Sequence, residues 1–321
     1  MGNRQKVSTF RWMLGMSMAT VFSSTYIFTP PYLLISIILL IFQYPTRNGS
    51  ILFAAPAILS MLLTSPVQST KWIGYLAPML DYFDYEEFHE ITNAQIIEHN
   101  RKKGAKKCII ALQPHGVISF CGMCAMVNAP EELRHTKTAA ASAVMKVPIL
   151  KNVMGIFGLT DASASNLRKQ FRNEGIKGSV CIYIGGIAEL FLSSRKVEKL
   201  YLSKRKGFIK LALREGVDII PVYLFGNTSV LTVLKSGPLA QLSRKLQASV
   251  TYFWGAYYLP IPRSEKLVYA RGPMMGLPHI PNPTNEDINK WHAKYCEEVN
   301  RLFETYKEKV PMYKNKTLQI E

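Results

Sequence analysis

Acidic residues are scarce in this chain, and cysteines are scarcer. Its 321 residues include 22 Asp and Glu against 39 Lys and Arg, so the formal net charge is +17 at pH 7. Five cysteines are an odd number and too few for a disulfide framework in a chain of this length. Cys121 and Cys124 have the spacing of a metal or redox pair, but no second pair accompanies them, so we expect small core residues.

Several catalytic signatures are absent as well. The globular part has no G-x-S-x-G elbow, and the chain has no G-x-x-x-x-G-K-[ST] loop, no G-x-G-x-x-G and no H-E-x-x-H. These absences disfavour a serine hydrolase, a P-loop nucleotidase, a dinucleotide-dependent dehydrogenase and a zinc protease. The positive charge admits nucleic acid as a partner, but zinc-finger spacing, RNP-like sequence and a basic recognition helix with heptads are all missing.

Charge is missing altogether from residues 12–42. The prolines at Thr29-Pro30-Pro31 divide this segment into two apolar halves, each short for a full span of about 20 residues. Because a double proline interrupts a helix, we predict a membrane helical hairpin that spans the bilayer or inserts part-way. Basic residues flank both ends, which places both on the cytoplasmic side: Arg4, Lys6, Arg11 and Arg47.

The rest of the chain divides into a short apolar part and a long mixed part. A third uncharged segment, residues 51–70, contains two prolines and is expected to be re-entrant or interfacial, with the apolar floor of the domain as the alternative. Beyond it, Val- and Ile-rich runs such as 180–184 and 217–225 alternate with helical patterns such as 207–214. We predict a membrane hairpin and interfacial segment over residues 1–70 and an α/β domain over residues 71–321.

A helix is predicted near the C-terminus. Thr284 followed by Asp287 has the spacing of a helix start. An apolar stripe at helical spacing follows and is interpreted as a packing face: Ile288, Trp291, Tyr295, Val299, Leu302 and Tyr306.

One histidine stands out by its position. The apolar run 108–112 ends abruptly at Gln113-Pro114-His115-Gly116. Histidine is the usual general base at neutral pH, and glycine allows a substrate to approach the backbone closely. Alone, the motif also fits a structural histidine in a turn.

Two further segments favour a site. One is a glycine pair just after another apolar strand, in Tyr183-Ile-Gly185-Gly186-Ile-Ala-Glu189. The Glu189 carboxylate could orient the His115 imidazole, or the glycine backbone could donate to an oxyanion. A tight turn with a solvated glutamate is the alternative. Residues 195–214 hold eight Lys or Arg and one acid, Glu198. At a helix start such a run attracts the phosphates of a nucleotide-like carrier, although a solvated basic face is the common explanation.

The sequence resembles the type 2 diacylglycerol acyltransferase family, which includes monoacylglycerol and wax-alcohol acyltransferases. The resemblance covers residues 70 to 310, and the family's membrane hairpin matches residues 12–42. It depends on these motifs: Tyr82-Phe83, Gln113-Pro114-His115-Gly116, Gly185-Gly186-x-Ala-Glu189, Arg205-Lys-Gly-Phe-x-Lys-Leu-Ala-Leu-Arg with Pro221-x-Tyr-x-Phe-Gly226, and Pro283-Thr-x-x-Asp287-Ile-x-x-x-His292-x-x-Tyr295.

The resemblance implies a glycerolipid-acyltransferase-like mixed sheet flanked by helices, and transfer of a fatty acyl group from acyl-CoA to diacylglycerol at the endoplasmic reticulum membrane or the lipid droplet. Both termini would be cytosolic, so none of the glycosylation patterns at Asn48, Asn227 and Asn315 would be modified. His115 would be the general base. Acyl-CoA is a substrate, so no cofactor, metal or nucleic acid is expected, and a homo-oligomer is left open. Substrate binding is assigned to Gln113, Pro114, Gly116, Gly185, Gly186, Arg205, Lys206, Gly207, Phe208 and Lys210, with the basic residues on the CoA phosphates.

The chain departs from the family pattern at three positions. Gln113 replaces the first histidine of H-P-H-G, Asp84 replaces a proline, and Phe120 stands where the wider H-x4-D motif has its acid. The acid partner of His115 is therefore assigned to Glu189. Two alternatives remain: a monoacylglycerol or long-chain alcohol as the acceptor, and a non-catalytic scaffold whose basic face binds anionic lipid.

Overall fold

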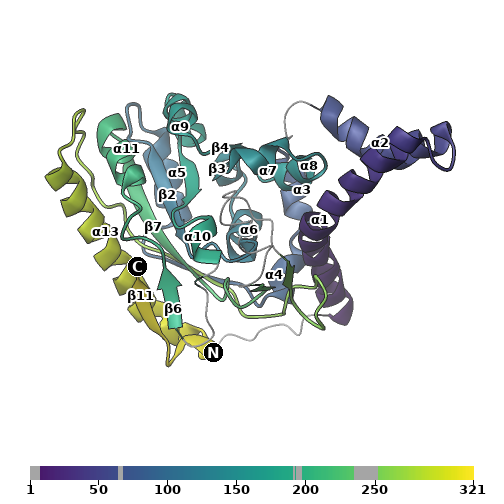
Figure 1. Cartoon of the computed structure of the whole chain (residues 1–321). Coiled ribbons are helices and arrows are strands. Elements are labelled where there is room, and N and C mark those ends of the chain that lie inside the picture. Colours follow the sequence, from purple (N-terminus) through teal and green to yellow (C-terminus); the bar gives the residue numbers. More distant parts are fainter. Residues whose placement is uncertain (1–7, 64–67, 191, 193–196, 235–251) are drawn as a thin grey trace.

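A seven-stranded mixed sheet forms the centre of the protein (Figure 1). The computed structural model describes residues 8–63, 68–190, 192, 197–234 and 252–321. The strand order is β1-β10-β7-β2-β5-β3-β4, and every neighbouring pair is parallel except β10 and β7. The bounds are β1 (Glu86–His89), β2 (Cys108–Gln113), β3 (Lys137–Ala140), β4 (Leu159–Asp161), β5 (Val180–Tyr183), β7 (Asp218–Phe225) and β10 (Val268–Arg271). The predicted mixed α/β architecture is confirmed.

Helices cover both faces of this sheet. Figure 1 shows α11 and α13 on one side and α6, α4 and α1 on the other. The helices are α1 (Thr9–Phe42), α2 (Arg47–Leu62), α3 (Thr70–Tyr75), α4 (Pro78–Tyr82), α5 (Asn93–Arg101), α6 (Phe120–Asn128), α7 (Ser142–Lys146), α8 (Leu150–Gly155), α9 (Ala164–Phe171), α10 (Ile187–Leu190), α11 (Gly207–Glu215) and α13 (Asn285–Tyr306). Two small sheets pair β6 (Val197–Leu200) with β11 (Thr317–Ile320) and β8 (Thr232–Val233) with β9 (Phe253–Trp254).

The central strand β2 is buried on both faces. Ile109 and Ala111 pack in the core formed with α9, α11 and α13, whereas Ile110 and Leu112 pack in the core formed with α1, α4 and α6. Successive side chains of a strand point to opposite faces, so a strand covered on both sides reads as the continuous apolar run seen in the sequence.

The C-terminal helix begins where the sequence predicts. The Thr284 side chain accepts the backbone N–H of Asp287, and the Asp287 carboxylate accepts the backbone N–H of Thr284. This capping box satisfies two donors that the first helical turn leaves free. The predicted stripe packs against the core, which confirms its interpretation.

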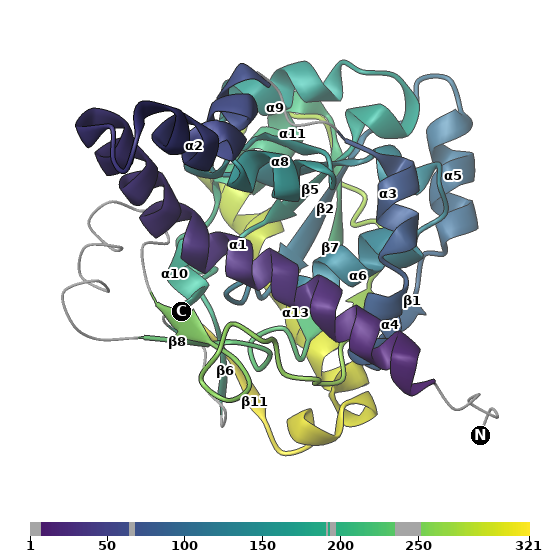
Figure 2. The ribbon, with the colours of Figure 1, turned by 90° about the vertical axis from the view of Figure 1, so that its right-hand side faces the viewer.

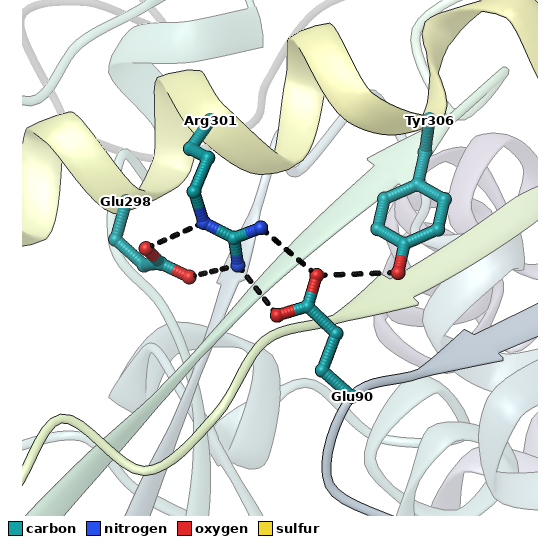
Figure 3. A network of polar contacts seen from close by, with 4 residues as sticks. All are labelled: Glu90, Glu298, Arg301 and Tyr306. Carbon is teal, nitrogen blue, oxygen red and sulfur yellow. Dashed lines mark hydrogen bonds and ion pairs between the residues drawn. The ribbon is translucent and has the colours of Figure 1, made fainter.

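A polar network joins α13 to the end of β1 (Figure 3). Arg301 donates to both carboxylate oxygens of Glu298 and to both of Glu90, and the Tyr306 hydroxyl donates to Glu90 at 3.2 Å. A planar guanidinium can donate paired hydrogen bonds to two carboxylates at once. These bonds hold α13 against the edge strand β1.

The predicted break in the N-terminal segment is wrong. Helix α1 runs from Thr9 to Phe42 without interruption and contains Pro30 and Pro31. Proline's fixed φ is compatible with a helix, and its cost is the hydrogen bonds that its missing N–H cannot donate, a cost tolerated in apolar helices where neighbouring groups compensate. The chain turns instead at residues 43–46, and α2 then packs on α1 through Phe53, whose carbonyl accepts the Tyr32 hydroxyl.

Helix α1 has two different halves. Its first half packs on α4: a Cβ at Gly15 would lie 2.1 Å from the Pro78 carbonyl oxygen, and Arg11 pairs with Asp81. Its second half and α2 expose apolar side chains such as Ile41 and Leu52. Within the described residues, α1 is the one helix that is long and apolar enough to cross a membrane.

Candidate active site

Three adjacent parallel strands carry the candidate site. Strands β7, β2 and β5 are neighbours in the sheet, so their carboxyl ends lie at one edge. The loop after β2 contains His115, the turn after β5 contains Gly185 and Gly186, the short helix α10 that follows contains Glu189, and Asn227 follows β7. Ligands of open α/β sheets bind beyond the carboxyl ends of the strands, and the fold therefore brings the predicted base to a suitable place.

The His115 imidazole has a defined tautomer. Its Nδ1 lies 2.7 Å from the Gly116 carbonyl oxygen. A carbonyl only accepts hydrogen bonds, so Nδ1 carries the proton and Nε2 keeps a free lone pair. Burial lowers the pKa of His115 below 6.5, against an opposing effect of the Gly116 carbonyl. At neutral pH the ring is a neutral base, packed edge-on against Tyr183 with ring centres 4.7 Å apart.

Glu189 contacts His115 in a way that the sequence did not predict. Its Oε2 accepts the backbone N–H of His115 at 2.9 Å, whereas the imidazole is held by Gly116. Burial raises the pKa of Glu189 to about 8, although the backbone N–H groups of His115 and Tyr201 act in the opposite direction. At neutral pH this group is largely an uncharged carboxyl that fixes the loop. It is not a counter-ion of the imidazole.

Glycines make room for these contacts. Gly116 has φ +64°, and a Cβ there would lie 2.6 Å from the Asn227 carbonyl oxygen. A Cβ at Gly185 would lie 1.9 Å from the Glu189 carboxyl carbon, whereas one at Gly186 (φ +57°) would meet nothing within 4 Å. Close packing against the Asn227 backbone therefore requires glycine at 116, Gly185 leaves room for the Glu189 side chain, and the left-handed backbone favours glycine at 186.

Asn227 is a site residue that the sequence analysis missed. Its buried amide nitrogen donates to the carbonyls of Pro114 (2.9 Å) and His115 (2.6 Å) and to the Ser119 hydroxyl (3.2 Å). Its amide oxygen accepts the backbone N–H of Cys121 at 3.1 Å. One side chain thus holds both ends of the loop that carries His115. The available sequence signal for Asn227 was its position just after strand β7, at the same end of the sheet as His115.

A cavity of about 610 Å³ borders His115. Strands β3 and β5 and helices α6, α7 and α8 surround it, and Tyr26 of α1 also lines it. The side chains that line it are mostly small or apolar, among them Ala139, Ala140, Ala143, Val144, Met126 and Leu159. The volume lies in the range of small-molecule sites, and the lining suits a hydrocarbon chain.

The three basic residues expected to bind CoA phosphates differ in whether they line this cavity and in what they contact. Arg205 lines it, donates to the Gly185 carbonyl at 3.4 Å and has its guanidinium 5.1 Å from the centre of the Tyr201 ring. Lys206 instead donates to Asn289 of α13 at 2.7 Å, and Lys210 is exposed on α11.

Gly207 and Phe208, two adjacent residues of the predicted substrate-binding set, lie in different environments. Gly207 is exposed at the start of α11. Phe208 is buried in the core and packs edge-on against Tyr295, with ring centres 4.8 Å apart.

Comparison with known proteins identifies the family of this chain. The family model described as diacylglycerol acyltransferase matches residues 80–321. The chain belongs to the diacylglycerol acyltransferase family. Its relatives include "Diacylglycerol O-acyltransferase 2" of Dictyostelium discoideum, 28% identical over 68% of this chain and 72% of that protein, and the human protein of the same name, 23% identical over 73% and 65%. Mouse "Acyl-CoA wax alcohol acyltransferase 1" is 26% identical over 62% and 66%.

Among solved structures, the crystal structure of the 1-acyl-sn-glycerophosphate acyltransferase PlsC from Thermotoga maritima aligns with a TM-score of 0.44 and 12% identity, covering 91% of this chain and 97% of that one.

The family motif H-P-H-G is altered at Gln113, and the structure shows what that residue contacts. Gln113 is fully buried, and its Oε1 accepts the Tyr295 hydroxyl of α13. Pro114 is also buried, and its carbonyl accepts from Asn227. These two residues hold the loop through their contacts with Tyr295 and Asn227, and they do not line the cavity that borders His115.

Cys121 and Cys124 lie on the buried face of α6, as expected for core residues. Burial raises the pKa of both thiols, which disfavours reactive thiolates. Among the described residues, no three His, Cys, Asp or Glu side chains are arranged to hold a metal ion.

Proposed function

We propose that this protein is a membrane-bound acyl-CoA:diacylglycerol O-acyltransferase with His115 as the general base. The observation that carries the proposal is the free Nε2 of His115 beside a largely apolar cavity that reaches α1, in a chain of the diacylglycerol acyltransferase family. Relatives named diacylglycerol O-acyltransferase 2 support diacylglycerol as the acceptor.

In the proposed reaction, Nε2 of His115 takes the proton of the diacylglycerol hydroxyl while that oxygen attacks the thioester carbonyl of acyl-CoA. The carbon–sulfur bond then breaks, and the imidazolium returns its proton to the leaving CoA thiolate. Triacylglycerol and free CoA are the products, and the histidine ends neutral. A positioned base of this kind contributes about 10²–10⁴ to the rate.

Each substrate has a corresponding place. The apolar cavity suits the acyl chain, and Arg205 at its border suits a CoA phosphate, with Lys206 and Lys210 on the same basic segment. Helix α1 would bring the enzyme to diacylglycerol dissolved in the bilayer. The flanking basic residues support cytosolic termini at the endoplasmic reticulum or lipid droplet.

The test of the acceptor uses the full-length protein in a membrane fraction. One radiolabelled acyl-CoA is supplied with diacylglycerol, monoacylglycerol or a long-chain alcohol in parallel. We expect labelled triacylglycerol to dominate. A dominant wax ester or diacylglycerol product would change the acceptor, and no acyl-CoA-dependent product with any of them would favour the scaffold alternative.

Acyl transfer should weaken on acidification. Nε2 must be unprotonated to accept the hydroxyl proton, and the pKa of His115 is lowered below 6.5. We therefore expect kcat/KM to be level from about pH 7 to pH 8 and to fall as the pH drops below about 6.5, because the imidazolium cannot act as a base. A profile that still rises between pH 7.5 and pH 9 would contradict a neutral His115 at pH 7.

Replacing Glu189 separates its two possible roles. If its neutral carboxyl only accepts the His115 backbone N–H, E189Q should keep activity within about threefold, because an amide oxygen accepts the same bond. E189A should lose about tenfold or more, since buried donors are left unpaired. Rates from equal amounts of folded protein decide it. If E189Q is as inactive as E189A, the carboxylate charge is needed.

A further inference from the structure

Exposed aromatic side chains flank α1 on two sides. On α3, Trp72 and Tyr75 are 66% and 68% exposed and lie edge to face. On the other side, residues 255–262 after β9, which we call the aromatic loop, expose Tyr257 (86%) and Tyr258 (79%). Figure 2 shows α1 crossing this face between α3 and β8, the strand that pairs with β9 directly before the loop.

Hydrogen bonds join the aromatic loop to α1 and α4. The Ser23 hydroxyl of α1 donates to the Pro260 carbonyl, and the Tyr82 hydroxyl of α4 donates to the Pro262 carbonyl. Within the loop, the backbone N–H of Gly255 donates to the Leu259 carbonyl at 2.7 Å, and Ala256 bridges to Ile261. The loop that carries the exposed rings therefore lies on the same face as α1.

The two exposed tyrosines of the loop have a strained backbone. Tyr257 and Tyr258 have φ of +56° and +61°, a left-handed region that bulky residues rarely adopt. Strain of this kind concentrates at functional sites. Two consecutive strained tyrosines that are almost fully exposed do not stabilise the core of the protein, so their role lies in what they contact outside it.

We propose that the aromatic loop and the Trp72–Tyr75 pair rest in the headgroup–acyl boundary of a lipid leaflet, with α1 between them. Tyrosine and tryptophan favour this boundary because their rings are apolar and their polar atoms reach water. The surface is continuous with exposed apolar side chains of α1, such as Phe10, Val21 and Phe28.

This arrangement rests on the membrane association in the proposed function and deepens it. Since Tyr26 of α1 lines the cavity beside His115, a domain seated on this face places the α1 side of the cavity against the leaflet. A neutral lipid acceptor would then reach the base without entering bulk water.

The test measures the depth of single positions in the membrane. Full-length protein carrying Y258C, Y75C or, on the opposite face, K290C is labelled with an environment-sensitive fluorophore and reconstituted in phosphatidylcholine vesicles containing lipids brominated at shallow chain positions. Labels at 258 and 75 should be quenched at least twofold more than the label at 290, which should instead be quenched by aqueous iodide. Protein without an added cysteine supplies the background.

Two other outcomes have clear meanings. An I38C label on α1 quenched by lipid, while 258 and 75 behave like 290, overturns the inference and leaves the proposed function intact. Shielding of 258 that depends on protein concentration and not on brominated lipid indicates a second copy of the chain, and also overturns it. Because no readout requires acyl transfer, inactive protein with quenched labels would count against the proposed function alone.

A paired variant links the surface to activity. Asparagine tolerates a left-handed backbone, so Y257N/Y258N keeps the loop conformation and removes the rings. We expect KM for vesicle-borne diacylglycerol to rise at least threefold, with kcat and KM for acyl-CoA unchanged. An unchanged acceptor KM would contradict the proposal.

Discussion

Replacing His115 with alanine should reduce acyl transfer by a factor of about 10²–10⁴ while leaving the protein folded and in the membrane. The substitution removes Nε2, the only ring atom free to take the acceptor's proton, and it keeps the backbone N–H that donates to Glu189. Transfer from radiolabelled acyl-CoA, measured with equal amounts of membrane-bound protein, gives the ratio.

Two further variants show whether the base itself is responsible. H115N provides a side-chain amide donor that can replace Nδ1–H at the Gly116 carbonyl, but it offers no basic nitrogen, so it should be as inactive as H115A. H99A, on α5, should retain wild-type activity, because the His99 ring contacts the Lys106 carbonyl at the opposite end of β2 from His115. Substantial activity in H115N would mean that the ring only shapes the loop and that another group accepts the proton.

Local patterns were sufficient to predict much of the fold. Strand β2, the start of α11 and the capping box at Thr284 depend on residues close together in the sequence, and each was predicted within about one residue. Pro30-Pro31 misled for the opposite reason: proline rules describe an isolated helix in water, whereas α1 continues through both residues.

The candidate site was predictable only in part. The role of His115 could be predicted from one motif, because a histidine directly after a buried strand lies at the end of the sheet. The cavity could not, because its walls come from segments as distant as Tyr26, Ala139 and Arg205. The contact of Glu189 with a backbone N–H, and not with the imidazole, depends on a side-chain conformation that no sequence pattern encodes.

Asn227 illustrates this limit most clearly, because the sequence marks it only as a glycosylation pattern. In the structure it is 1% exposed, and its amide nitrogen has three acceptors around it. In N227D one carboxylate oxygen would face the carbonyl oxygens of Pro114 and His115, now 2.9 and 2.6 Å from the amide nitrogen. An unpaired charge in such a place costs about 3–5 kcal/mol, so we expect kcat to fall at least 100-fold at pH 7.

The pH dependence of N227D distinguishes positioning of the loop from a general loss of structure. Burial among carbonyl oxygens raises the pKa of a carboxyl group, so the aspartic acid should become protonated as the pH falls and recover one donor toward the loop. The activity of N227D should therefore rise on acidification from pH 8 to about pH 6.5, where wild type is level or falling, whereas N227A should keep the wild-type shape at a lower level. N315D, at an exposed asparagine in the same sequence pattern, is the matched control and should behave as wild type. Thermal unfolding in detergent identifies protein that has simply failed to fold, and a folded N227D with full activity at pH 7 would show that the loop holds His115 without this amide.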